Sequence, residues 1–146
     1  MKKIGLNLLL LLMLTGCAQA VPPPVPYRPK PTPTPIPEPA KRGNYAEINS
    51  DAEYNVYKQK HKDSPVCEYF FATWCGPCQQ FGPIYKKVAA NHKHVLFVKI
   101  DVDRCPQAST MNQVKSLPTI LIKGERFVGG QNEQEFTNRV LKFFPK

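Results

Sequence analysis

Residues 70–81 read FFATWCGPCQQF, with Cys75 and Cys78 on either side of Gly76-Pro77. A cysteine pair at this spacing can exchange electrons, hold a metal ion or cross-link the chain. The aromatic run before the pair predicts a strand buried on both faces, followed by a helix that opens at Cys75. Cys78 would then lie one helical turn later, and Pro77 suits a first turn because it has no N–H.

The segments around this motif predict alternating strands and helices. Apolar or aromatic runs predict strands at residues 45–48, 66–72, 95–100, 120–122 and 126–128. Amphipathic patterns predict helices over about 51–61, 75–91 and 136–144, with one or two helical turns within 101–114. The order β-α-β-α-β-α-β-β-α predicts an α/β fold. Its mixed sheet would have about five strands, helices on both faces, and a site at the carboxyl end of a central strand.

Local signals mark several element boundaries. Ser50 and Glu53 form a predicted capping box, in which each side chain bonds a backbone N–H at the start of the helix. Lys123-Gly124 predicts a two-residue hairpin turn. Pro83 lies inside the second helical pattern and predicts a kink there.

Several short motifs stand at a fixed spacing in residues 45–146: WCGPC at 74–78, Pro83, Asp101-Val102-Asp103, Leu117-Pro118-Thr119 and Phe-Val-Gly at 127–129. On these residues, this part of the chain resembles the thioredoxin family. The resemblance implies the thioredoxin fold and a thiol–disulfide oxidoreductase that uses Cys75 and Cys78 without a cofactor. It also implies a cis peptide bond before Pro118. The substrate groove that it implies would be lined by Trp74, Gly76, Pro77, Leu117 and Pro118, with Gly129 as a further candidate.

The sequence departs from the family pattern in two places. The family usually buries a carboxylate six residues before the first cysteine, as a proton acceptor for the second. Tyr69 stands there, with Glu68 beside it on the opposite face of the strand and Lys99 at the position of the lysine that neighbours the acid. Either a bulge turns Glu68 toward the cysteines or water transfers the proton. The hairpin from Leu117 to Gly129 is also shorter than usual, which trims the sheet edge.

The N-terminus carries a predicted lipoprotein signal. Met1-Lys2-Lys3 precedes the almost wholly apolar run 4–14, and Leu14-Thr15-Gly16-Cys17 follows. The run is about 11 residues, too short to cross ~30 Å of hydrocarbon, and is typical of a secretory signal. The small residues before Cys17 resemble the bacterial lipoprotein cleavage box, which implies a signal peptide over 1–16 and lipid attachment at Cys17. An ordinary signal peptide cut near residues 18–20 and a retained membrane anchor are the alternatives.

Residues 22–39 contain ten prolines among eighteen residues. Proline fixes φ and donates no backbone hydrogen bond, so this segment cannot build a packed core. It predicts an extended polyproline II spacer of roughly 55 Å. We interpret residues 17–44 as a lipidated N-terminus and tether that holds the domain, 45–146, off a membrane. A ligand for a proline-binding module is the alternative.

The charge distribution argues against a nucleic-acid partner. Residues 1–44 carry six Lys/Arg and one Glu, and residues 45–146 carry fourteen Lys/Arg against ten Asp/Glu, a formal charge of +4. The domain has no basic stripe interleaved with aromatic residues. We expect a monomer whose partners are protein disulfides, a membrane electron donor and, through Cys17, the membrane itself.

The remaining candidate ligands and thiols favour no second site. A metal site needs three or four ligands, but the chain has no second CxxC, and His92 and His94 fall where a helix ends and are expected in solvent. A disulfide across four residues also constrains little unfolded chain, which argues against a purely structural cross-link. Cys67 and Cys105 fall at opposite ends of neighbouring parallel strands, so we predict two buried free thiols. Cys105, nearer the active end, is a candidate regulatory thiol.

The direction of electron flow is the last question that the sequence raises. The cell envelope is kept oxidising, so a dithiol there needs a partner that keeps it reduced. Gly-Pro is the dipeptide of reducing thioredoxins, whereas disulfide-introducing relatives usually carry Pro-His. We therefore expect a periplasm-facing reductase fed by a membrane electron importer, with Ala18 after Cys17 resembling an outer-membrane sorting signal. The alternatives are an oxidase or isomerase, and a non-enzymatic assembly or metallochaperone lipoprotein.

Overall fold

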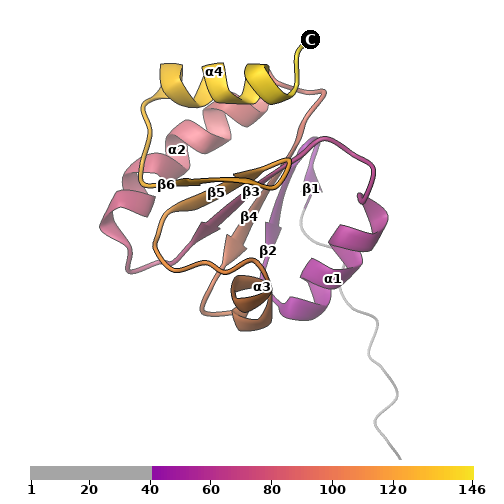
Figure 1. Ribbon diagram of the computed structural model, residues 1–146, viewed down its shortest axis with the longest axis vertical. Helices are drawn as coiled ribbons and strands as arrows, with labels where there is room; N and C mark the ends of the chain where they lie inside the picture. Colours follow the sequence, from indigo (N-terminus) through magenta and orange to yellow (C-terminus); the bar gives the residue numbers. More distant parts are fainter. Residues whose placement is uncertain (1–40) are drawn as a thin grey trace, which may run out of the picture. The chain divides into compact units, whose positions relative to one another are not determined.

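A six-stranded mixed sheet forms the centre of the fold (Figure 1). The computed structural model describes residues 41–146, so the predicted signal peptide, Cys17 and most of the tether lie outside the described residues. The strands lie in the order β1-β2-β4-β3-β5-β6, with the bounds β1 (Lys41–Arg42), β2 (Tyr45–Ile48), β3 (Val66–Phe71), β4 (Leu96–Asp101), β5 (Thr119–Ile122) and β6 (Glu125–Val128). β2, β4 and β3 run parallel, while β1, β5 and β6 are antiparallel to their neighbours.

Four helices cover the two faces of this sheet. They are α1 (Asp51–Lys60), α2 (Gly76–Asn91), α3 (Pro106–Met111) and α4 (Glu133–Phe143). α2 and α4 pack on one face, and α1 and α3 on the other (Figure 1). The predicted arrangement, a mixed sheet with helices on both faces, is therefore confirmed. β1 is an addition to the predicted order, because two residues are too few to show any periodicity.

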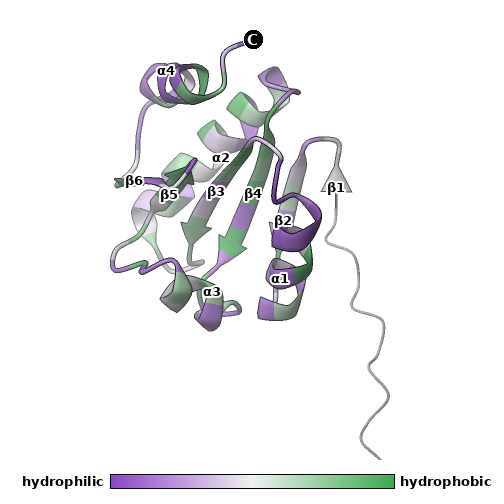
Figure 2. Ribbon diagram, turned by 45° about the vertical axis from the view of Figure 1, so that its right-hand side comes forward, coloured by the Kyte–Doolittle hydropathy of each residue, from purple (hydrophilic) through white to green (hydrophobic). Residues whose placement is uncertain are grey.

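The core lies on both faces of the central strands, which are mainly hydrophobic (Figure 2). Side chains alternate between the faces, so Tyr69 joins the cluster under α2 and α4 while Phe70 joins the cluster under α1 and α3. β3 pairs with β4 without a break, Glu68 opposite Val98 and Tyr69 opposite Lys99. β3 therefore contains no bulge that could exchange the two faces.

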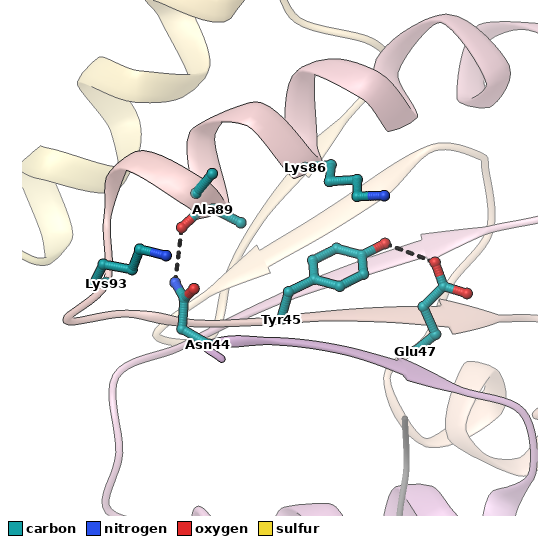
Figure 3. A pocket seen from close by; sticks show the side chains of 7 residues that line it. Asn44, Tyr45, Glu47, Lys86, Ala89 and Lys93 are labelled. Carbon is teal, nitrogen blue, oxygen red and sulfur yellow. Dashed lines mark hydrogen bonds between the residues drawn. The ribbon is translucent and has the colours of Figure 1, made fainter. Parts of the chain in front are cut away.

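Asn44 joins the start of β2 to the end of α2. Its buried side-chain amide lies within hydrogen-bonding distance of the carbonyl oxygens of Ala89 at 2.8 Å, His92 at 3.0 Å and Val95 at 2.8 Å (Figure 3). The last carbonyls of a helix have no partner within the helix. The two N–H groups of Asn44 are shared among these three carbonyls, of which those of Ala89 and His92 also accept from a backbone N–H.

Other helix and turn boundaries follow local sequence signals. Ser50 caps α1 as predicted, accepting a hydrogen bond from the Glu53 N–H at 3.2 Å. The Glu53 carboxylate accepts from the N–H of Asn49 rather than of Ser50, so the predicted box is shifted by one residue. Lys123 and Gly124 both have positive φ, 50° and 84°, as a two-residue hairpin turn requires. α2 is continuous through Pro83.

Within residues 41–146, none of the helices combines the length and the apolar character that crossing a membrane requires.

Candidate active site

Cys75 and Cys78 form a disulfide at the amino end of α2, with their Cα atoms 5.2 Å apart. Cys75 is the N-cap residue, and its Sγ accepts a hydrogen bond from the Cys78 N–H at 3.2 Å. No acidic residue lies in the first turn of α2. When the pair is reduced, the unpaired N–H groups and the dipole of the helix therefore favour a negative charge on the Cys75 sulfur.

A groove of about 490 Å³ opens beside the disulfide. Four of the residues predicted for a substrate groove line it next to Cys75: Trp74, Gly76, Pro77 and Leu117. The sequence did not predict that the groove is also lined by Val102, Ser109, Val114, Lys115 and Ser116, although Val102 belongs to the Asp101-Val102-Asp103 motif. These residues come from the segment after β4, from α3 and from the loop before β5. The fold alone brings them together.

Trp74 stands out at the rim of the groove because 69% of its surface is exposed. Its indole Nε1–H donates a hydrogen bond of 2.8 Å to the Asp103 carboxylate, which holds the ring in place. The Asp103 N–H in turn donates to the Asp101 carboxylate at 3.0 Å. The Asp-Val-Asp motif was recognised in the sequence, but its contact with Trp74 spans 29 residues and no local pattern predicts it.

The Leu117–Pro118 peptide bond is cis, as predicted. Pro118 is buried beside the groove, and its carbonyl oxygen accepts a hydrogen bond from Gly129 N–H at 2.9 Å. A Cβ atom on Gly130 would lie 3.8 Å from the Pro77 carbonyl oxygen. The chain after β6 therefore reaches the amino end of α2, and Gly129 belongs to this region.

Tyr69 lies beneath the cysteine pair, where a carboxylate was expected from the resemblance. Its hydroxyl donates a hydrogen bond of 3.0 Å to the Cys78 carbonyl oxygen. Its ring centre lies 5.2 Å from that of Phe81 and 4.9 Å from that of Tyr85, inside an aromatic cluster. Burial raises the pKa of the Tyr69 hydroxyl well above its ordinary value, so it stays protonated and cannot act as a proton acceptor.

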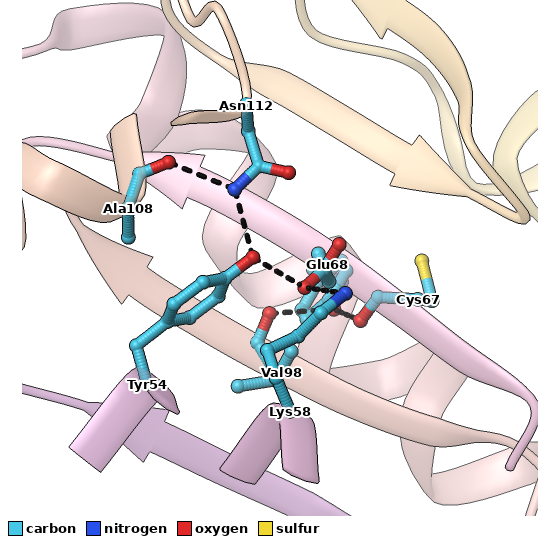
Figure 4. Close-up of polar contacts among 8 residues, drawn as sticks. Tyr54, Lys58, Cys67, Glu68, Val98, Ala108 and Asn112 are labelled. Atoms are coloured by element: carbon cyan, nitrogen blue, oxygen red, sulfur yellow. Dashed lines mark hydrogen bonds and ion pairs between the residues drawn. The ribbon is translucent and has the colours of Figure 1, made fainter. Parts of the chain in front are cut away.

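Glu68 does not replace the missing acid, because its side chain is on the other face of the sheet (Figure 4). Its buried carboxylate accepts hydrogen bonds from the Tyr54 hydroxyl at 3.0 Å and from Lys58 Nζ at 3.1 Å. The Asn112 amide donates to the same Tyr54 hydroxyl at 2.7 Å. Glu68 therefore connects α1, β3 and the end of α3. Of the two acceptors proposed for the Cys78 proton, Glu68 and water, only water remains.

Cys67 and Cys105 are buried free thiols, as predicted. Burial first, and then nearby acidic groups led by Asp51, raise the pKa of Cys105 to about 12. Burial raises the pKa of Cys67 even more. Both groups therefore remain thiols near neutral pH. Since a thiolate is the reactive form, the structure argues against the suggested regulatory role of Cys105.

The expectation for the two histidines is wrong for His92. His94 is exposed and its Nε2 lies 3.0 Å from the Phe144 carbonyl oxygen, but His92 is only 5% exposed. The buried Nδ1 of His92 has no hydrogen-bond partner. Burial, and then the charges of Lys146 and His94, lower the pKa of His92 below its ordinary value. Among residues 41–146, His, Cys, Asp and Glu side chains form no group of three that could hold a metal ion.

A second cavity, of about 380 Å³, lies over Asn44 and Tyr45 at the side of α2 (Figure 3). Lys86 and Lys93 stand at its edge, and the Tyr45 hydroxyl donates to the Glu47 carboxylate at 2.9 Å. None of its lining residues belongs to the groove beside the disulfide.

Comparison with known proteins shows which protein family shares this fold and sequence. The family profile described as thioredoxin matches residues 46–142. Thioredoxin-1 of Caenorhabditis elegans is 38% identical over 99 residues, covering 65% of this chain and 84% of the relative. A thioredoxin-like protein of Synechocystis sp. is 44% identical over 59 residues, covering 40% of this chain and 56% of the relative. The crystal structure of thioredoxin NaTrxh from Nicotiana alata superposes with a TM-score of 0.63 at 29% identity, covering 71% and 96% of the two chains.

Proposed function

Because this chain belongs to the thioredoxin family, we propose that it is a reductase of protein disulfides in a bacterial cell envelope, acting through Cys75 and Cys78. The solved structures confirm the predicted thioredoxin fold, and the family match supports the predicted thiol–disulfide oxidoreductase activity. The family also implies protein disulfides as substrates. The direction of the reaction, the roles of individual residues and the location of the protein are the proposal.

The positions of the two cysteines decide which one attacks the substrate and which one resolves the mixed disulfide. Cys75 caps α2 and lines the groove, whereas Cys78 lies one turn into the helix and does not line it. Both cysteines are largely buried in the disulfide, at 6% and 3% exposed, so their position relative to the groove is what separates them. A substrate disulfide can therefore approach Cys75, and the helix amino end favours the thiolate there. Cys78 is placed to attack only the mixed disulfide that Cys75 forms with the substrate. Cys75 is accordingly the attacking thiol and Cys78 the resolving thiol.

The cycle begins with the reduced pair. The Cys75 thiolate attacks one sulfur of the substrate disulfide, which breaks that bond, and the departing substrate sulfur takes up a proton. Cys78 then loses its proton and attacks the Cys75 sulfur. This forms the Cys75–Cys78 disulfide and releases the second substrate thiol. Two electrons have moved to the substrate, and a dithiol electron donor at the membrane must return them.

The groove residues position the substrate chain for this attack. Trp74, Gly76, Pro77 and Leu117 surround Cys75 and would contact residues next to the substrate cysteine. Because Pro118 has no N–H, the backbone of the neighbouring Leu117 is left free to pair with an extended substrate segment. Trp74, fixed by Asp103, supplies an apolar surface at the rim.

Trapping of partners tests these roles. A Cys78→Ser variant should accumulate mixed disulfides through Cys75, because the second step is blocked. A Cys75→Ser variant should trap none and should not reduce insulin. If Cys78→Ser traps no partner, or if insulin reduction survives Cys75→Ser, the roles are wrong. Cys67→Ser is the matched control, and it should behave as wild type because Cys67 is buried.

The envelope location depends on the N-terminal sequence. We propose that residues 1–16 are removed, that Cys17 carries the lipid, and that residues 17–44 tether the domain, 45–146, to a periplasm-facing membrane, the outer membrane rather than the inner. Replacing Cys17 with Ser should release the chain from the membrane fraction after the signal is processed. If the variant, with its signal processed, stays in the membrane fraction after a high-salt wash that removes charge-based binding, the lipid anchor is contradicted.

A further inference from the structure

Six exposed lysines gather at the end of the sheet that is opposite the disulfide. This set, here called the basic pole, consists of Lys60, Lys62, Lys93, Lys123, Lys142 and Lys146. The parallel strands begin at this end and run toward the redox site, while α1, α2 and α4 finish here (Figure 1). The basic pole is thus formed from four chain segments that are far apart in the sequence.

Side-chain contacts show that these segments adjoin one another. Lys62 and Lys123 line one surface cavity of about 340 Å³. Lys123 Nζ lies 5.0 Å from the centre of the Phe144 ring. The Phe144 carbonyl oxygen lies 3.0 Å from His94 Nε2, next to Lys93. The lysines therefore occupy one continuous end of the domain and are not scattered over its surface.

The net charge of the domain resides at this pole. Asp63 and Glu125 are the acidic side chains there, and Asp63 lies 3.9 Å from Lys62. Glu68 and Lys58 line the same cavity as Lys62 and Lys123, but they pair with each other and together add no net charge. Six lysines against two acids give +4, which equals the formal charge of residues 45–146, fourteen basic against ten acidic. The rest of the domain, including the redox end, is neutral overall.

We infer that the basic pole binds the surface of an anionic phospholipid membrane. Arg42 in β1 pairs with Tyr45 at this end, but within residues 45–146 the cationic side chains of the pole are all lysines. Protein interfaces are enriched in arginine and depleted in lysine, whereas lysine acts as a flexible point charge that needs no fixed acceptor geometry. Lysines near an anionic leaflet are attracted to it without such geometry. A diffuse negative surface therefore fits the pole better than an acidic protein does.

This contact would orient the enzyme. With the pole on the membrane, the carboxyl ends of β3 and β4 and the groove beside Cys75 point away from it. Together with the proposed lipid anchor, the active site would face soluble partners across the envelope and not lipids of its own membrane. The binding itself does not depend on the anchor or on the direction of electron flow, so it can be tested separately.

Vesicle co-sedimentation tests the inference. The probe is the chain from residue 17 with Cys17→Ser, mixed with vesicles of phosphatidylglycerol and phosphatidylethanolamine or of phosphatidylcholine alone. Binding is expected only to the anionic vesicles and should weaken with salt. The pole variant Lys62→Gln/Lys123→Gln/Lys142→Gln should lose on the order of a hundredfold in affinity, about fivefold per lysine.

A charge-matched control separates position from total charge. Lys86→Gln/Arg104→Gln/Lys115→Gln removes the same three charges elsewhere and should bind anionic vesicles nearly as wild type does. Equal losses in the two triple variants would overturn the inference, as would equal binding to both vesicle types. If wild type binds neither vesicle, the inference is also wrong, and an acidic protein becomes the partner to seek. The pole variant should still reduce insulin at the wild-type rate, which shows that it is folded.

Discussion

At the scale of single residues, Tyr69 distinguishes this redox site. A buried phenol replaces a carboxylate beneath Cys78, and its hydroxyl bonds the Cys78 backbone rather than the sulfur. Because Glu68 is engaged with Tyr54 and Lys58 on the other face, it cannot replace that carboxylate as acceptor of the Cys78 proton. The resolving step must then pass its proton to water or to the departing substrate sulfur.

Tyr69→Phe tests whether this hydroxyl is structural. Removing one buried hydrogen bond should lower the free energy of unfolding by about 1 kcal/mol. Insulin reduction should stay within about twofold of wild type, since the hydroxyl takes no part in proton transfer. Chemical denaturation and an insulin assay measure the two effects. A loss of activity of tenfold or more in a folded variant would show that the hydroxyl acts in the chemistry.

His92 should make folding stability depend on pH. Its pKa is lowered in the folded protein, so between that pKa and the ordinary value of about 6.5 the unfolded chain binds more protons. The stability is fully present above about pH 6.5 and is lost as the pH falls through the folded pKa. Denaturation from pH 8 to pH 5 should show a shallower decline in His92→Gln than in wild type. Identical slopes in the two proteins would contradict this assignment.

At the scale of elements, the sequence predicted what local chemistry determines. The strand before Cys75, the turn at Lys123-Gly124 and the helix that begins at Cys75 all follow from periodicity or turn residues. β1 was missed because it has only two residues, although its pairing with β2 is local, across the turn at Gly43-Asn44. The groove, by contrast, depends on contacts between segments that are far apart in the sequence. Trp74, Gly76, Pro77 and Leu117 belong to recognisable motifs, but the wall opposite them is brought in by α3 and its following loop.

Asn44 connects β2 to the end of α2, and no local sequence pattern predicts this contact because its partners lie 45 to 51 residues away. Asn44→Ala would remove the side-chain donor to the buried Val95 carbonyl, and it would leave the Ala89 and His92 carbonyls with their backbone donors alone. Each such loss costs about 1–3 kcal/mol, so unfolding free energy should fall by at least that amount. Asn55→Ala on the exposed side of α1 is the control and should change it by less than about 0.5 kcal/mol. Equal effects in a denaturation series would refute the capping role.

At the scale of the whole molecule, the redox site and the net positive charge of the domain lie at opposite ends. The redox disulfide and its groove lie where the parallel strands finish, and the basic pole lies where they begin. The N-terminal sequence adds a proposed lipid anchor and a spacer, residues 17–44, outside the described domain. These parts suit an enzyme that is held at one membrane and presents its thiols to proteins beyond it.

The central claim is that this pair gives electrons to protein disulfides, and the reduction potential of Cys75–Cys78 tests it most directly. Equilibration of the purified protein with glutathione or dithiothreitol gives the potential, and alkylation of thiols in intact cells gives the oxidation state. A reductase should have a potential near the thioredoxin value of about −270 mV, with the pair largely reduced in the envelope. A potential near about −120 mV, typical of strong disulfide-forming oxidants, with the pair oxidised in cells, would contradict the proposal.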